Sequence, residues 1–115
     1  MDTIERTIRS LGISGTYRGF LYLSDAVKLV LANEELLLAV CNKLYPAVAA
    51  IHHTTSDNVE RNIRTAISAC WTRGDRALIE MLFPYPLSAK PKASELIDAL
   101  AEHCRAAAQN IQTST

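Results

Sequence analysis

Three side chains that could recognise polar groups lie close together in residues 56–73: Glu60, Arg61 and Arg64. The apolar residues of this segment repeat at the spacing of an amphipathic helix: Val59, Ile63, Ala66, Ile67 and Cys70. With these assigned to a core, the outer face keeps Asn58, Glu60, Arg61, Arg64, Thr65 and Ser68. An arginine can donate two hydrogen bonds to O6 and N7 of guanine, and a glutamate can accept one from N4 of cytosine. The outer face therefore carries side chains suited to reading base edges.

The residues before this helix favour a helix-turn-helix. Pro46 fits the first turn of a helix that continues to His53. A polar turn follows, in which Thr55 or Ser56 is the expected N-cap of the next helix. Ala49 is small enough to let two helices cross closely, and an inward valine, Val59, follows ten residues later. The sequence thus predicts a helix-turn-helix over residues 46–73.

Short polar side chains near the turn supply a second kind of contact. Thr54, Thr55, Asn58 and Thr65 can donate hydrogen bonds to phosphate oxygens. The free amide groups at the start of the helix favour the same anions. We therefore expect these residues to hold the DNA backbone while the arginines read bases.

A plainer interpretation stays open at this point. Glu60 and Arg64 are four residues apart, as are Asp57 and Arg61. Such pairs stabilise many solvated helices by about 0.2–0.5 kcal/mol each. The spacing alone does not separate a reading helix from an ordinary solvated one.

The remaining segments predict an all-α, compact six-helix domain containing the helix-turn-helix. Helical spacing of apolar residues and plausible end signals place helices as follows: residues 4–11, 20–32, 34–44, 56–73, 77–83 and 94–108. The third is nearly all apolar, so we expect it to be buried on most sides. Tyr45-Pro46 marks either a bend in that helix or a new start. Residues 109–115 form a polar tail, which leaves residues 1–108 as the domain.

Composition narrows the function class. The 115 residues carry 12 basic and 12 acidic side chains, so any basic surface must come from placement. Three widely spaced cysteines form neither a disulfide framework nor a zinc site. We expect reduced thiols and a cytoplasmic protein, without signal peptide or membrane span. No nucleophile–base pair, paired carboxylates or metal cluster supports an enzyme, and we expect no cofactor or metal.

Residues 4–105 resemble the effector domain of the stage 0 sporulation protein A family, the sporulation initiation response regulators. The similarity is densest in the helix-turn-helix, where the matching residues are Thr54-Thr55, Val59-Glu60-Arg61, Ile63-Arg64, Ala66-Ile67, Trp71 and Arg73-Gly74. Further matches lie upstream in Gly19-Phe20-Leu21-Tyr22-Leu23 and downstream in Leu82-Phe83 and Ala89-Lys90-Pro91.

The resemblance implies a transcription regulator that binds double-stranded DNA at a box close to TGTCGAA, often repeated in tandem. It implies base contacts from Glu60, Arg61 and Arg64, and phosphate contacts from the turn and from Lys90. Lys92 can supplement Lys90. It also implies a head-to-tail homodimer on tandem sites, a phosphorylated receiver domain as the switch, and RNA polymerase as a candidate partner.

The sequence departs from the family pattern at three points. Asn58 stands where the family usually has a basic residue, and the loop between Tyr85 and Lys90 is shorter than in the family and lacks one lysine. No receiver domain is present in the 115 residues, so the chain is either a piece of a longer regulator or a stand-alone relative, and Met1 favours the second. A stand-alone domain could instead be a protein-interaction module that dimerises with a full-length regulator and modulates it. The neutral net charge and Asn58 favour this alternative.

Overall fold

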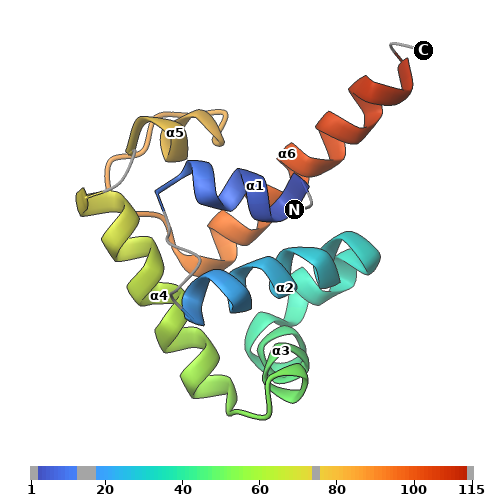
Figure 1. Ribbon diagram of the computed structural model, residues 1–115, viewed down its shortest axis with the longest axis vertical. Coiled ribbons are helices and arrows are strands. Elements are labelled where there is room, and N and C mark those ends of the chain that lie inside the picture. Colours follow the sequence, from blue (N-terminus) through green and yellow to red (C-terminus); the bar gives the residue numbers. More distant parts are fainter. Residues whose placement is uncertain (1–2, 13–17, 74–75, 114–115) are drawn as a thin grey trace.

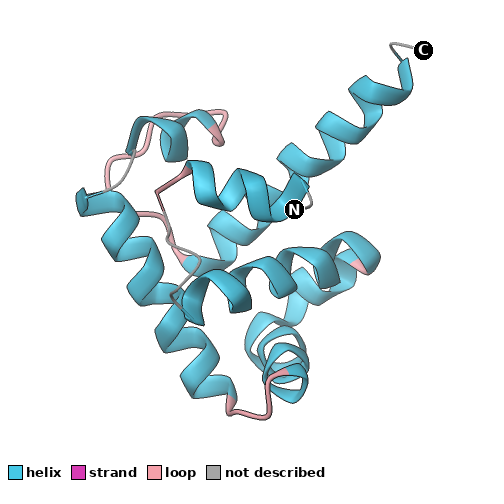
Figure 2. Cartoon of the chain, viewed as in Figure 1, coloured by secondary structure: helices cyan, strands magenta, loops and turns pink. Residues whose placement is uncertain are grey.

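The computed structural model describes residues 3–12, 18–73 and 76–113. These residues form six α-helices (Figure 1): α1 (Thr3–Ser10), α2 (Arg18–Ala32), α3 (Tyr45–Ile51), α4 (Ser56–Arg73), α5 (Arg76–Met81) and α6 (Ala93–Thr113). A 3-10 helix, η1 (Glu34–Ala39), and a π-helix, η2 (Val40–Leu44), connect α2 to α3. The described residues contain no strand (Figure 2). The predicted all-α, six-helix architecture is confirmed.

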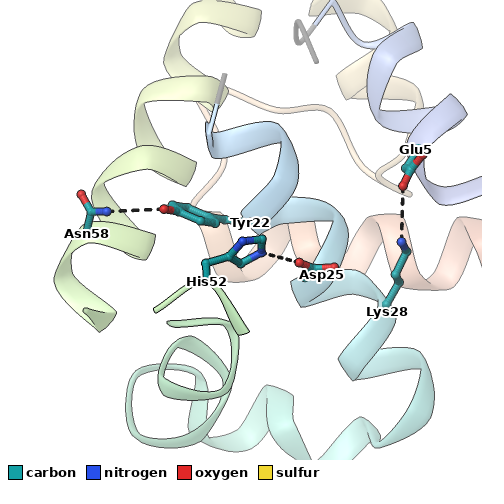
Figure 3. Close-up of polar contacts among 6 residues, drawn as sticks. All are labelled: Glu5, Tyr22, Asp25, Lys28, His52 and Asn58. Carbon is teal, nitrogen blue, oxygen red and sulfur yellow. Dashed lines mark hydrogen bonds and ion pairs between the residues drawn. The ribbon is translucent and has the colours of Figure 1, made fainter. Parts of the chain in front are cut away.

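Helix α2 lies at the centre of the domain, with α4 and α6 packed against it (Figure 1). Its buried side chains include Leu23, Val27 and Val30, none of which is exposed to solvent. Helix α6 contributes Leu96, Ile97, Leu100 and Ala101 to the same core. An ion pair between Lys28 of α2 and Glu5 of α1, at 3.4 Å, adds a polar contact at the rim (Figure 3).

The crossing of α2 and α4 depends on Gly19. A Cβ atom at this position would lie 2.3 Å from the carbonyl oxygen of Asn62 and 2.7 Å from the Cβ of Ala66. Such distances are far inside van der Waals contact, so only glycine allows the two helices to approach this closely. Gly19 therefore fixes where α4 sits against the core.

The turn between α3 and α4 has defined geometry. The amide of Thr54 donates to the carbonyl of Ala49 at 2.9 Å, and His53 between them has a φ of 53°. This is the pattern of a Schellman helix end, with a non-glycine residue in the left-handed region. The hydroxyl oxygen of Thr55 then accepts from the amide of Asn58 at 3.1 Å, which makes Thr55 the N-cap of α4.

The expectation for residues 34–44 was wrong in two respects. The segment is not an α-helix but η1 followed by η2, and Leu44 is its only fully buried side chain. Leu38 is 87% exposed. The apolar run 36–40 points in all directions around a helix, so Leu36, Leu37 and Val40 are only half-buried against the core and Leu38 faces solvent. Helix α3 then begins anew at Tyr45, with Pro46 in its first turn.

Other boundaries differ modestly from the prediction. Helix α2 begins at Arg18 rather than at residue 20, and α5 ends at Met81 because the amides of Leu82 and Phe83 form turn-type bonds three residues back. Helix α6 continues to Thr113, past the position where we expected a tail, through a run of alanines that favour helix. Gly74, expected to end α4, lies outside the described residues.

Within the described ranges, no helix combines the length and the apolar character needed to cross a membrane. The same ranges contain no group of three histidine, cysteine or acidic side chains placed to hold a metal ion.

Candidate nucleic-acid interface

Helix α4 lies along one edge of the molecule, with one face on the core and the other facing out (Figure 1). Its inward face consists of Val59, Ile63, Ala66, Ile67 and Cys70, each at most 3% exposed. Arg61, Arg64 and Thr65 are exposed on the other side. At about 100° per residue, Arg61 lies opposite the centre of the buried stripe. No described element covers these three side chains.

Glu60 stands at the flank of this face and forms an ion pair with Arg64 one turn later. The side chains are 36% and 64% exposed, respectively. An exposed pair of this kind contributes little stability, so it can exchange for contacts with another molecule. The expected pair between Asp57 and Arg61 does not form, although both residues lie in the described part of the chain.

Behind Glu60 lies Tyr45, which is only 4% exposed. Burial, together with the nearby carboxylate of Glu60, raises the pKa of Tyr45 to about 12. The phenol is therefore a neutral hydroxyl at physiological pH. Tyr45, Glu60 and Arg64 line a groove of about 430 Å³.

Lys90 and Lys92, from the loop before α6, also line this groove. The Nζ of Lys90 donates to the hydroxyl of Ser68 on α4 at 2.6 Å. The amide of Lys92 donates to the carboxylate of Glu95 at 2.9 Å, which caps the start of α6. Both lysines are exposed, and both lie beside the outward face of α4.

The turn places its polar side chains differently. Thr55 is exposed, and Thr54 is half-buried. The hydroxyl oxygen of Thr54 accepts a hydrogen bond from the side chain of Asn58 at 2.8 Å. The hydroxyl oxygen of Thr55 accepts one from the backbone amide of Asn58 at 3.1 Å. Each hydroxyl proton remains available to a further acceptor. The carboxamide of Asn58 itself is turned toward the interior of the turn.

A scan of protein families matches residues 4–104 of this chain to the model described as "Sporulation initiation factor Spo0A C terminal". The match covers nearly the whole chain. The chain belongs to this family. Its region of similarity agrees closely with the one inferred from individual residues, which spans residues 4–105.

As a member of the Spo0A C-terminal family, the chain is a DNA-binding effector domain of the sporulation-regulator type. Membership also places it with a regulatory domain rather than with an enzyme family. DNA is accordingly the partner that the family assigns to it.

Sequence reasoning missed part of the polar structure around the Spo0A-type helix-turn-helix. Tyr22 and Asp25 of α2 meet His52 at the end of α3 and Asn58 of α4 (Figure 3). Asp25 and His52 are 27 residues apart, and no short motif links them. No local signal could have found this contact, because Asp25 and the nearby Lys28 fit ordinary polar positions of an amphipathic helix.

Proposed function

We propose that this domain recognises a specific duplex DNA sequence by placing the N-terminal half of α4 in the major groove. Glu60, Arg61 and Arg64 contact base edges there. The observation that carries the proposal is the uncovered outward face of α4, on which Arg61 and Arg64 are exposed and Glu60 adjoins Arg64. This is the face and the helix half that a helix-turn-helix presents to DNA.

The side chains around α4 are suited to contact the phosphates on both sides of the DNA major groove. Lys90 and Lys92 stand on one flank as exposed cations. Thr54 and Thr55 stand at the other end, with hydroxyl protons free to donate, and Thr65 is exposed between. Contacts of this kind fix the register of the protein on DNA without reading its sequence.

The DNA target we propose is a box close to TGTCGAA, bound by a homodimer where two boxes lie in tandem. RNA polymerase is a further proposed partner. The net charge of zero implies that binding relies on a few placed cations, and therefore on specific contacts more than on bulk attraction.

The test is a fluorescence-anisotropy titration of two labelled duplexes, one with the box and one with the same bases scrambled. Each is measured at roughly 50 and 200 mM salt, a range over which phosphate contacts are strongly weakened. The proposal predicts that the domain binds the box more tightly than the scrambled duplex, with a ratio of affinities approaching roughly 10³, the lower end of the range for sequence-specific proteins. Equal affinities for the two duplexes would overturn it.

A second candidate, a module that dimerises with and modulates a full-length regulator, is favoured by the zero net charge and by the neutral Asn58. It predicts weak binding to both duplexes. It also predicts that the domain lowers the DNA affinity of a complete regulator when the two are mixed. The titration therefore separates the two functions.

A further inference from the structure

Five polar side chains from three elements meet behind the first turns of α4. They are Tyr22 and Asp25 of α2, His52 at the end of α3, and Asn58 and Asn62 of α4, and we refer to them as the polar clamp. Figure 3 shows four of them, with Tyr22 lying between Asn58 on one side and His52 and Asp25 on the other. The clamp lies under the helix-turn-helix, away from its outward face.

Asn58 uses its carboxamide entirely within the protein. Its Nδ2 donates to the hydroxyl of Thr54 at 2.8 Å and to the phenol of Tyr22 at 3.5 Å. Its Oδ1 accepts from the Nδ2 of Asn62 at 3.0 Å. A carboxamide has two N–H donors, and both have partners here. A phosphate contact from Asn58 would have to break one of these bonds.

The other half of the clamp joins α2 to the end of α3. Nε2 of His52 and Oδ2 of Asp25 are 2.5 Å apart, and both side chains are 24% exposed. The imidazole also packs edge-on against the ring of Tyr22, with centroids 5.0 Å apart. Tyr22 is only 3% exposed, so these polar contacts form in a partly dehydrated setting where they are stronger than in water.

The position of the clamp complements that of Gly19. Gly19 holds the middle of α4, near Asn62 and Ala66, against α2. Apolar packing of Val59 and Ile63 also holds α4 on the core, but such packing has no preferred direction, whereas hydrogen bonds one turn from the Gly19 contact restrict the angle of the helix. The clamp provides such a bond between α4 and α2 at Asn58, two residues before Glu60.

We propose that the polar clamp sets the angle of α4 for base reading, and that Asn58 is a positioning residue rather than a contact to phosphate. The inference rests on the proposed function, because it concerns how the same helix is presented to DNA. Side chains that read bases must be held within a fraction of an ångström, and a supporting network of hydrogen bonds can provide this.

Substituting Asp25 is a sharp test, because simple electrostatics and the polar clamp predict opposite changes in the affinity for the box. Asp25 does not lie on the outward face, and it is negatively charged. On electrostatics alone, Asp25→Ala would tighten binding to any DNA, because it removes a charge of the same sign as phosphate. The clamp predicts the opposite for the box: affinity falls about fivefold relative to the scrambled duplex, the size expected for losing a hydrogen bond.

Two more variants follow the chain of contacts. Asn58→Ala should lower the preference for the box about tenfold, and Tyr22→Phe, which removes only a hydroxyl, about twofold. The double variant of Asp25→Ala and Asn58→Ala should lose less than the product of the single losses, because the residues act in one network. A direct phosphate contact predicts instead that Asn58→Ala weakens both duplexes equally and that Asp25→Ala does not weaken either. That result would overturn the proposal.

Ile79→Val controls for loss of stability, since Ile79 is buried in α5 and lies outside the clamp. It should lower thermal stability and leave the preference for the box unchanged. If it lowers the preference as the clamp variants do, the effect is general destabilisation and the clamp explanation is wrong.

A measurement without DNA keeps this inference separate from the proposed function. In the free domain, Asp25→Ala and Tyr22→Phe should speed amide hydrogen exchange at residues 59–63 of α4 more than at residues 69–73. Equal or unchanged exchange in the two halves would overturn the clamp. If the wild-type domain fails to distinguish the two duplexes, the proposed function fails, and the exchange measurement still decides whether the clamp holds the start of α4.

Discussion

The segments on either side of α3 differ in a way that composition does not anticipate. Glu34–Leu44 is richer in apolar residues than Ser56–Arg73, yet Leu44 is its only fully buried side chain. In α4, Ile63 is completely buried, while Leu38 of η1 is 87% exposed. Burial follows the spacing of apolar residues rather than their number, because a helix can turn only one stripe toward a core.

The same difference decides which segment can recognise DNA. In α4, five inward residues occupy one side, which leaves Arg61, Arg64 and Thr65 together on the exposed side. The apolar run of η1 and η2 leaves no such coherent polar face. A regular amphipathic helix thus provides both the packing and the surface that we propose reads DNA.

The largest expected effect sharpens this contrast. Ile63→Ala should lower the free energy of unfolding by about 2–5 kcal/mol, because it leaves a cavity in the core. Leu38→Ala, which removes a similar volume from an exposed position, should change it by less than about 0.5 kcal/mol. Urea denaturation of both variants is the measurement. Similar losses would mean that η1 is buried in solution.

The next effect concerns how α4 is held against the core. Gly19→Ala places a methyl group against the backbone of Asn62, so α2 and α4 must separate. The expected loss is about 1–3 kcal/mol in the free energy of unfolding, as for other overpacked sites. The preference for the box should fall as well, because α4 shifts. A variant as stable as the wild type would show that the two helices separate freely.

A smaller effect tests the flank of the outward face. Lys90→Ala should weaken binding to the box and to the scrambled duplex alike, and should reduce the slope of log K against log salt by about 0.9, the value for one phosphate contact. Lys28→Ala is the matched control, because Lys28 pairs with Glu5 of α1 instead. If Lys90→Ala acts only on the box, Lys90 contributes to base reading and not to backbone contact.

The smallest effect concerns how each segment begins. Segment η1 starts at Asn33, whose side chain accepts from the amide of Glu35 at 3.2 Å. Helix α4 is capped in the same way by Thr55, but the turn before it holds His53 at a φ of 53°. His53→Gly should raise the free energy of unfolding by about 0.5 kcal/mol, since relief of the left-handed backbone slightly outweighs the added chain entropy. Thermal denaturation would measure the change in stability, and a lower midpoint for the variant would show that His53 is not strained.

Much of the fold and of the candidate site could be predicted from local pattern. The spacing of Val59, Ile63 and Ala66 predicted α4 and its inward face, and the polar turn predicted the N-cap at Thr55 or Ser56, which Thr55 provides. The placement of Lys90 against Ser68 could not be predicted, because the two residues are 22 apart and α5 and the loop before α6 lie between them. Nor could the exposure of Leu38, since an uninterrupted apolar run carries no directional signal.

The pairing of His52 with Asp25 was the least accessible part. Each residue alone fits an ordinary surface position, and only the crossing of α2 and α3 brings them together. Polar contacts between elements depend on crossing angles, which are set by packing details such as the missing side chain of Gly19. Local pattern gives the elements, and the contacts between them supply the rest.

The central claim is that the outward side chains of α4 read bases. The direct test is to measure Kd for the box and the scrambled duplex with Arg61→Ala, Arg64→Ala and the control Arg6→Ala, which changes an exposed arginine on α1. The first two variants should each lose about 1–3 kcal/mol of binding to the box with much smaller losses on the scrambled duplex, and the control should keep the wild-type preference. Unchanged preference for the box in both α4 variants would contradict the account.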